Sequence, residues 1–214
     1  MQAYMILNQM IASKLAVVIR GDNQTMAEKT ADACVKGGVK TLEITFTVPK
    51  AIQLIEKLID RYDKEVLIGA GTVLDSVTAK IAIISGAKFI VSPSFDKETA
   101  KLCNRYQIPY LPGCMTINEM LRAVEYGVSV LKLFPSQSYK PCFIKSLHEP
   151  LPYLNIMPTG GITIDNVGAW LEAGAVMVGV GGEITRPAKD GDFDKVEKRA
   201  NEFQKKVQKW INDY

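Results

Sequence analysis

Val130-Leu131-Lys132-Leu133-Phe134-Pro135 has the pattern of a short β-strand with a lysine at its centre and a proline at its end. Because side chains alternate between the two faces of a strand, Val130, Lys132 and Phe134 share one face and the two leucines share the other. Apolar neighbours on both faces remove the lysine from water, which disfavours its charged form and lowers its pKa. A neutral amine of this kind forms Schiff bases with carbonyl substrates. The alternative is a lysine at a strand end whose ammonium reaches solvent.

This stretch is one of eight strand-like runs that alternate with helical segments along the chain. The predicted strands are residues 15–20, 41–46, 65–72, 88–93, 108–111, 129–134, 154–158 and 175–180. A leading helix is predicted at residues 2–13, and the other helices at 25–36, 49–62, 75–85, 96–106, 116–126, 140–148, 163–173 and 192–210. Because every connection contains a helix, the strands should run parallel. Eight repeats predict a single domain, residues 1–214, folded as a (β/α)8 TIM barrel. The alternative is a doubly wound open sheet, which usually has fewer strands.

The composition is that of an ordinary globular protein: 214 residues, 47% hydrophobic and 23% charged, with a formal net charge of +3. That charge is too small and too scattered to indicate a nucleic-acid partner. No apolar run reaches the length of a membrane span, and the N-terminus lacks the features of a signal peptide. The four cysteines form no CxxC pair, which is typical of reduced thiols in a cytoplasmic protein. The single histidine, His148, excludes a multi-histidine metal site and disfavours a Ser-His-Asp triad, so no metal is expected.

Glu43 occupies a position equivalent to that of Lys132 on another predicted strand. Leu42 and Ile44 point to one side of the strand at 41–46, and Glu43 points to the other. Because helices cover the outside of a barrel, the aliphatic residues should face outward and Glu43 should face the interior. A carboxylate near the lysine can shuttle protons between water, carbinolamine and substrate carbon. The alternative is a purely structural ion pair, but perturbed pairs of this kind cluster at functional sites.

Other polar residues and glycines late in the predicted strands are candidates for binding an anion. Arg20 either holds a substrate carboxylate through a bidentate pair or neutralises Asp22 or Glu43. Thr72 offers a hydroxyl after a glycine-rich turn, near a helix start. Thr159 with Gly160 and Gly161, and then Gly181 with Gly182, follow the last two strands, where barrels bind phosphate.

The chain resembles the bacterial 2-keto-3-deoxy-6-phosphogluconate (KDPG) aldolases, which also act as 4-hydroxy-2-oxoglutarate (KHG) aldolases. The resemblance runs from about residue 15 to residue 196 and rests on an ordered set of short motifs. These are Val18-Ile19-Arg20-Gly21, Leu42-Glu43-Ile44-Thr45, Gly69-Ala70-Gly71-Thr72-Val73-Leu74, Ser92-Pro93, Pro112-Gly113, Leu131-Lys132-Leu133-Phe134-Pro135, Pro158-Thr159-Gly160-Gly161-Ile162 and Gly181-Gly182.

The resemblance implies a class I aldolase in which Lys132 is the Schiff-base lysine and Glu43 is the general acid/base. It implies that Thr72 binds the pyruvate carboxylate, that no metal or other cofactor is needed, and that the protein is a homotrimer. The substrate-binding residues expected on this basis are Arg20, Thr47, Thr72, Pro93, Phe134, Thr159, Gly160, Gly161, Gly181 and Gly182.

Two positions depart from the family pattern. Many members carry an arginine four residues after the glutamate, where it holds the pyruvate carboxylate; this chain has Thr47 there, and we expect Arg20 to take over the role. Where Gly-Gly-Ser is usual in the phosphate site, this chain has Gly181-Gly182-Glu183. A carboxylate repels a phosphate unless it points away, so Glu183 bears on whether the substrate is phosphorylated.

The expected reaction is cleavage of a 2-keto-3-deoxy acid to pyruvate and an aldehyde, which is glyceraldehyde 3-phosphate from KDPG or glyoxylate from KHG. Lys132 attacks the C2 ketone, Glu43 relays protons through a water, and the imine is the electron sink. One alternative is a phosphate-binding sugar isomerase or epimerase, which forms no imine. The other is a non-catalytic binding protein derived from the same fold.

Overall fold

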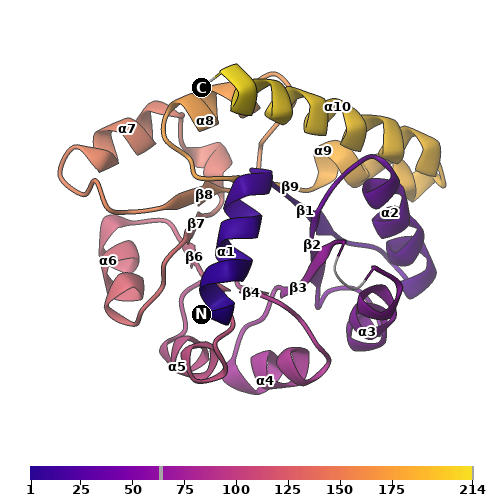
Figure 1. Ribbon diagram of the computed structural model, residues 1–214, viewed down its shortest axis with the longest axis horizontal. Coiled ribbons are helices and arrows are strands. Elements are labelled where there is room, and N and C mark those ends of the chain that lie inside the picture. The colour runs from indigo at the N-terminus through magenta and orange to yellow at the C-terminus, as the bar shows by residue number, and fades with distance from the viewer. Residues whose placement is uncertain (63–64, 214) are drawn as a thin grey trace.

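Parallel strands in two sheets form the centre of the molecule (Figure 1). This computed structural model describes residues 1–62 and 65–213. The first sheet has six strands in the order β5-β4-β3-β2-β1-β9, and the second has three in the order β6-β7-β8. Their bounds are β1 Leu15–Ile19, β2 Thr41–Thr45, β3 Leu67–Gly71, β4 Ile90–Val91, β5 Tyr110–Leu111, β6 Gly113–Cys114, β7 Leu131–Leu133, β8 Ile156–Pro158 and β9 Val178–Val180.

The expected closed eight-stranded TIM barrel is therefore wrong, because the strands divide into a six-stranded and a three-stranded sheet. At one junction Pro112 separates β5, which pairs with β4, from β6, which pairs with β7. Proline has no N–H to continue a ladder, and its carbonyl accepts from the Lys132 amide at 3.0 Å. At the other junction, between β8 and β9, Thr159 and Gly179 form an isolated bridge instead of a ladder.

Helices alternate with the strands, as predicted, and surround them (Figure 1). The α-helices are α1 Gln2–Ser13, α2 Gln24–Lys36, α3 Ala51–Tyr62, α4 Ser76–Ile84, α5 Lys97–Tyr106, α6 Ile117–Glu125, α7 Cys142–His148, α8 Val167–Glu172, α9 Gly182–Thr185 and α10 Phe193–Asp213. Two short 3-10 helices, η1 Ser136–Ser138 and η2 Arg186–Asp190, complete the described elements. Among these helices, none combines the length and apolar character that crossing a membrane requires.

Side chains at the helix starts explain where several helices begin. Asn23, Asp75 and Asp96 each accept a hydrogen bond from the backbone N–H three residues on, which satisfies a donor that the helix itself leaves free. Thr116 and Glu119 form the predicted capping box at the start of α6.

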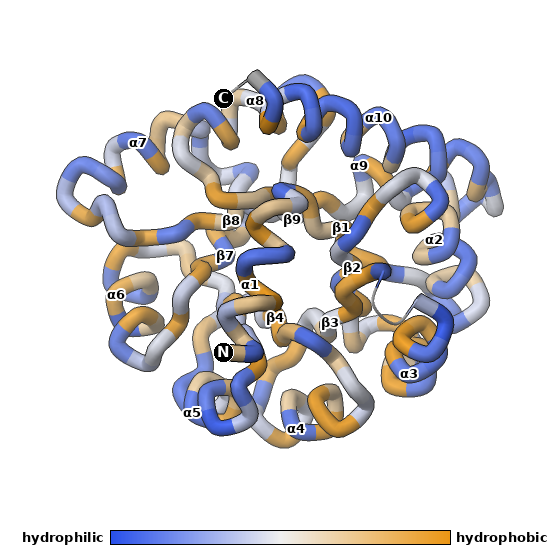
Figure 2. The backbone as a smooth tube through the Cα atoms, viewed as in Figure 1, coloured by the Kyte–Doolittle hydropathy of each residue, from blue (hydrophilic) through white to orange (hydrophobic). Residues whose placement is uncertain are grey.

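Two apolar clusters fill the space on either side of the strands. The larger lies between strands and helices and includes Leu131 and Leu133, whereas the smaller includes Val130 together with side chains from both sheets. Helix α1 contributes Ile6 and Met10 to the smaller cluster, and it crosses one end of the strands (Figure 1). Figure 2 shows the hydrophobic residues concentrated on the central strands and hydrophilic ones along the outer side of α10. The alternation along β7 therefore turns Lys132, like Val130, toward the interior.

Candidate active site

Lys132 and Glu43 form a buried pair across the interior. Lys132 lies on β7 in the second sheet and Glu43 lies on β2 in the first. The Lys132 Nζ is 3.7 Å from the Glu43 Oε1, and their side chains are only 6% and 2% exposed. The prediction that both side chains point away from their aliphatic neighbours is confirmed. Each is buried in the interior, whereas the aliphatic residues on either side of it belong to the larger apolar cluster between strands and helices.

The surroundings of this pair are poor in other polar partners. The Lys132 Nζ lies 4.9 Å from the centroid of the Phe134 ring, at cation–π distance. Among the described residues, Glu43 Oε1 has no hydrogen-bond partner. A buried polar atom without a hydrogen bond costs about 1–3 kcal/mol of stability. An unpartnered buried polar atom in a native structure is an exception, and a chemical role is one of its explanations.

Gly71 makes room for the Glu43 carboxylate. A Cβ at residue 71 would overlap the Glu43 Oε1, so only glycine leaves this carboxylate its position. The next residue, Thr72, adopts a left-handed conformation with φ 59°, which is rare for a β-branched side chain. Such backbone strain persists where the surrounding structure enforces it and is concentrated at functional sites.

Two hollows open at the carboxyl-terminal ends of β1 and β9. The glycine hollow, about 380 Å³, is lined by Phe134, Thr159, Gly160, Gly161, Gly181, Gly182, Glu183, Arg186, Arg20, Val18, Gln137, Ile162 and Thr163. The basic hollow, about 510 Å³, is lined by Arg20, Arg186, Lys189, Asp22, Thr47, Val18, Gly21, Met26, Gly182, Thr185 and Ala188. Phe134 connects the glycine hollow to the buried pair, because its ring also contacts Lys132.

Most of the predicted binding residues gather at these hollows. Phe134, Thr159 and the four glycines line the glycine hollow, Thr47 lines the basic hollow, and Arg20 lines both. Thr72 and Pro93 line neither hollow, although Thr72 directly follows the glycine that contacts Glu43. Thr159 is buried, and within the described residues its hydroxyl has no hydrogen-bond partner.

Arg20 lies close to threonine hydroxyls and, among residues 1–62 and 65–213, forms no ion pair. Its Nη1 donates to Thr47 Oγ1 at 3.4 Å, and Thr47 Oγ1 lies 2.7 Å from Thr45 Oγ1. In the described part of the chain, neither Asp22 nor Glu43 pairs with Arg20, so the alternative of a neutralising ion pair is not what the structure shows. The guanidinium is exposed beside two hollows and is available for an anionic ligand.

Two residues near the site were not identified from the sequence. Tyr110 is buried, its hydroxyl lies 2.7 Å from Ser92 Oγ and accepts from the Asp96 amide at 3.2 Å, and it thereby fixes the segment that carries Pro93. Burial raises the pKa of Tyr110 to about 12, so the phenol stays protonated. Arg186 lines both hollows, and the only sequence signal for it is a cation five residues after Gly181.

The cysteines do not compete with Lys132 as a nucleophile near the site. Burial raises the pKa of the Cys34, Cys103 and Cys114 thiols to about 12, which keeps them protonated and unreactive at neutral pH. Cys142 is exposed at the start of α7 and lines neither hollow.

Known proteins are similar to this chain in sequence and in fold. The family model for KDPG and KHG aldolase matches residues 6–199. The 2-dehydro-3-deoxy-6-phosphogalactonate aldolase of Escherichia coli is 32% identical over 173 residues, which cover 80% of this chain and 84% of that enzyme. The structure of the Legionella pneumophila KDPG aldolase, with pyruvate captured as a covalent carbinolamine intermediate, matches with a TM-score of 0.83. It is 27% identical, and the match covers 94% of this chain and 97% of that one.

A further solved structure is a cube-shaped protein cage designed by fusing symmetric oligomeric domains. It matches with a TM-score of 0.86 and 28% identity, over 93% of this chain and 73% of that one. The family resemblance expected from the sequence motifs is confirmed by the family model and by the curated relative. This chain belongs to the KDPG and KHG aldolase family and is a class I aldolase, a carbon–carbon lyase.

Proposed function

We propose that this aldolase cleaves a 2-keto-3-deoxy acid, KDPG or KHG, to pyruvate and an aldehyde, with Lys132 as its Schiff-base nucleophile and Glu43 as its general acid/base. The observation that carries the proposal is the buried pair itself, with 3.7 Å between the amine nitrogen and the carboxylate oxygen. A nucleophilic amine and a proton carrier at this separation can act on the same substrate carbon. The Legionella pneumophila relative, in which pyruvate is captured as a carbinolamine, supports this chemistry.

The reaction begins when the Lys132 amine adds to the C2 ketone to give a carbinolamine. Glu43, acting through a water, supplies the proton with which the hydroxyl leaves as water, and an iminium ion forms. Glu43, now a carboxylate, accepts the C4 hydroxyl proton through the water. The C3–C4 bond breaks, and its electron pair moves into the iminium to give an enamine. The aldehyde departs, C3 is protonated, and hydrolysis of the imine releases pyruvate and the free lysine.

We assign binding of the keto acid carboxylate to Arg20, with Thr47 beside it, and to Thr72, which directly follows β3. A guanidinium binds a carboxylate through two parallel hydrogen bonds, which fixes orientation as well as position. The Arg20–Thr47 contact supports this assignment, because it holds the guanidinium at the end of β1, whose Val18 pairs in register with Glu43. The remainder of the substrate then extends past Phe134 into the glycine hollow.

We also propose that the protein is a cytoplasmic homotrimer. Helix α4 supports an assembly, because Val77, Ile81 and Ile84 form an apolar stripe along its outer side, and Leu74, just before the helix, is also exposed; the exposures of these four side chains lie between 40% and 71%. The opposite side of α4 buries Ala79 and Ala82, so this helix is apolar on both sides. A helix of that kind is usually covered on both sides, and exposed apolar patches mark interfaces. The symmetric oligomeric domains of the related cage also support an assembly. The cytoplasmic assignment rests on the four unpaired cysteines.

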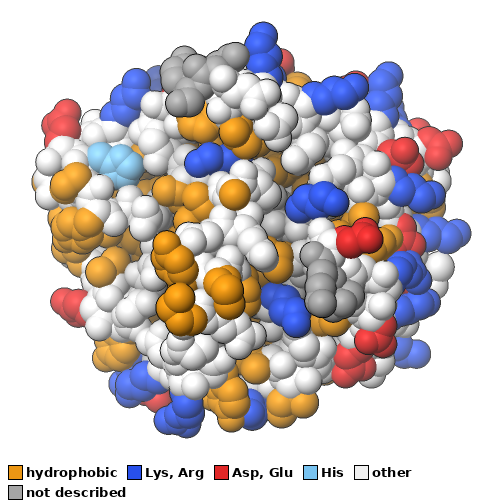
Figure 3. Space-filling model, in the orientation of Figure 1, with side chains coloured by type: hydrophobic (Ala, Val, Ile, Leu, Met, Phe, Trp, Pro, Cys, Tyr) orange, Lys and Arg blue, Asp and Glu red, His pale blue; other side chains and the backbone are white. Residues whose placement is uncertain are grey.

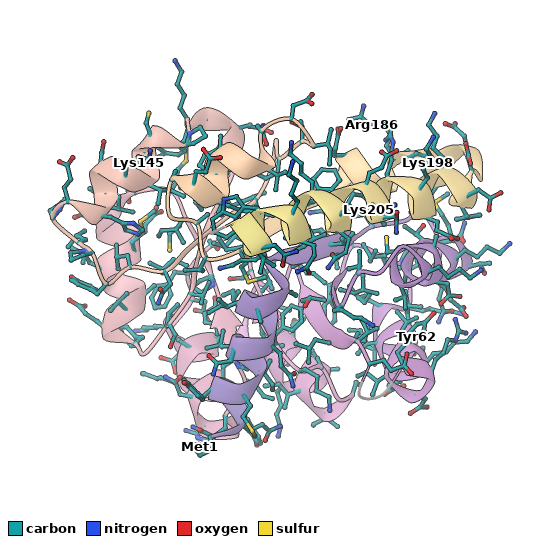
Figure 4. All side chains as sticks on the ribbon, turned by 45° about the horizontal axis from the view of Figure 1, so that its top comes forward. Met1, Tyr62, Lys145, Arg186, Lys198 and Lys205 are labelled. Atoms are coloured by element: carbon teal, nitrogen blue, oxygen red, sulfur yellow. The ribbon has the colours of Figure 1, made fainter. Side chains whose placement is uncertain are left out.

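Replacing Lys132 with arginine tests the catalytic assignment. Lys132→Arg keeps a positive charge beside Glu43, so the fold should survive, but a guanidinium cannot form the imine. We expect the rate of pyruvate release to fall more than about a thousandfold, as for other lost nucleophiles. Lys145→Arg is the matched control, because Lys145 is exposed on α7 (Figure 4). Activity of Lys132→Arg close to that of the control would contradict the covalent role.

A methyl group at residue 71 should displace the general acid/base. In Gly71→Ala the new Cβ occupies the position of the Glu43 carboxylate, and we expect kcat to fall at least about a hundredfold, within the range for a lost general acid/base. Gly168→Ala on α8 is the control, because a Cβ there meets nothing within 4 Å. Steady-state kinetics on both variants, with circular dichroism to verify folding, make the comparison. A folded Gly71→Ala enzyme with kcat like that of Gly168→Ala would remove Glu43 from the mechanism.

Charge on the α4 stripe should dissociate the assembly. Ile84→Lys places an ammonium at the most exposed position of the stripe, and burying it in an interface without a partner is unfavourable. We expect the wild type to sediment as a trimer and Ile84→Lys as a monomer, with Met5→Lys on α1 unchanged as the control. A monomeric wild type, or an Ile84→Lys protein that remains trimeric, would contradict the proposed interface.

A further inference from the structure

Two side chains of opposite charge, Glu183 and Arg186, line the glycine hollow together. Glu183 belongs to α9, and Arg186 is the first residue of η2. Arg186 is labelled in Figure 4. In the described part of the chain, no ion pair involves either side chain, so both charges are available to a ligand. The same hollow reaches Phe134, whose ring contacts Lys132. A substrate attached to Lys132 and extending along this hollow therefore meets both charges.

We propose that Arg186 and Glu183 select the substrate by the charge at its far end, accepting a singly charged carboxylate and disfavouring a doubly charged phosphate. This inference rests on the proposed function and adds to it the residues that determine specificity and the class of substrate that they favour. The favoured substrate is a keto acid with a second carboxylate.

The two side chains act on the far end of the substrate in opposite directions. The planar guanidinium of Arg186 matches a carboxylate in shape and can donate two parallel hydrogen bonds to it. Glu183 repels any anion in the same hollow, and the repulsion grows in proportion to the charge of the ligand. The attraction of Arg186 grows with the charge of the ligand in the same proportion, so the two side chains largely offset each other for either anion. What then separates the ligands is desolvation, because removing a doubly charged phosphate from water costs more than removing a singly charged carboxylate.

The backbone that carries these two residues is held in place. The carbonyl of Glu183 accepts a hydrogen bond from Arg199 Nη1 at 2.8 Å, which ties α9 to α10. Directly after Arg186, Pro187 and Ala188 are buried, and Ala188 belongs to the larger apolar cluster. The bases of both side chains are thus fixed relative to the hollow, as discrimination between ligands requires.

Lys189 provides a matched control for Arg186. It lies three residues further on in the same 3-10 helix, carries the same charge, is also exposed, and lines the basic hollow but not the glycine hollow. A general attraction between a basic surface and an anion would depend on both residues. Recognition inside the glycine hollow would depend on Arg186 alone.

The test measures kcat/KM for pyruvate release from three keto acids in the wild type and in Arg186→Gln, Glu183→Gln and Lys189→Gln. The substrates are 4-hydroxy-2-oxoglutarate, with a carboxylate at the far end, 2-keto-3-deoxy-6-phosphogluconate, with a phosphate, and 2-keto-3-deoxygluconate, with an uncharged hydroxyl. Because the substrates differ in length, their absolute rates are not compared. The comparison is how the ratio of kcat/KM between two substrates changes from the wild type to each variant.

We expect Arg186→Gln to lower kcat/KM for the dicarboxylate about tenfold, mainly through KM, and to leave the uncharged substrate within twofold. Glu183→Gln should raise the ratio of kcat/KM for the phosphorylated substrate to kcat/KM for the dicarboxylate about fivefold. The reason is that the repulsion removed acts more strongly on the doubly charged phosphate than on the carboxylate. Lys189→Gln should change every value by less than twofold.

Three results would overturn the inference while leaving the aldolase reaction intact. The first is a Glu183→Gln variant whose ratio of kcat/KM for the phosphorylated substrate to that for the dicarboxylate is unchanged. The second is an Arg186→Gln variant that loses as much kcat/KM with the uncharged substrate as with the dicarboxylate. The third is a Lys189→Gln variant whose loss of kcat/KM for the dicarboxylate is as large as that of Arg186→Gln. A folded wild type that releases pyruvate from none of the three substrates would instead contradict the proposed function, and this inference with it.

Discussion

The desolvated pair of Lys132 and Glu43 constrains the structure around it. Removing two charges from water costs several kcal/mol for each ion, and a buried pair is weak evidence for stability by itself. Here the attraction between the two side chains offsets part of this cost. Two separate sheets hold them close together, since β7 carries the lysine and β2 the glutamate. Gly71 leaves space for the carboxylate, and the Phe134 ring lies against the Lys132 Nζ. The strands and their neighbours thus hold two reactive groups close together in an interior that excludes most water. Charged side chains on the surface remain in water instead; Figure 3 shows Lys and Arg beside Asp and Glu mainly toward the edges of the face that it presents.

The inward direction of both residues could be predicted from the sequence because it depends on a local rule. Side chains alternate along a strand, so the aliphatic residues on either side of Lys132 and Glu43 determine which way each charge points. The helix starts could be predicted for the same reason, since the Thr116–Glu119 capping box needs only neighbouring residues. Arg186 could not be identified as a site residue from the sequence, because its position in the site depends on contacts between distant parts of the chain. It is an exposed cation in a short 3-10 helix, and only the folded chain brings it to the wall of the glycine hollow, which Phe134 also lines.

The division into two sheets could not be predicted from the pattern of strands and helices. That pattern gives the order and the parallel direction of the strands, whereas closure depends on hydrogen bonds between segments far apart in the sequence. Pro112 separates β5, which pairs with β4, from β6, which pairs with β7, and Thr159 and Gly179 make only a bridge between β8 and β9. Neither interruption moves the reactive pair, because Lys132 and Glu43 lie within strands that keep their register with their neighbours, Lys132 with Gly113 and Glu43 with Val18 and Gly69.

The central claim is that Lys132 forms a covalent imine with the keto acid. Its most direct test is incubation of the wild type with pyruvate and borohydride, followed by intact mass measurement and peptide mapping. The account predicts one reduced pyruvate adduct per chain, located on Lys132. A folded protein with no adduct, or with the adduct on a different lysine, would contradict it.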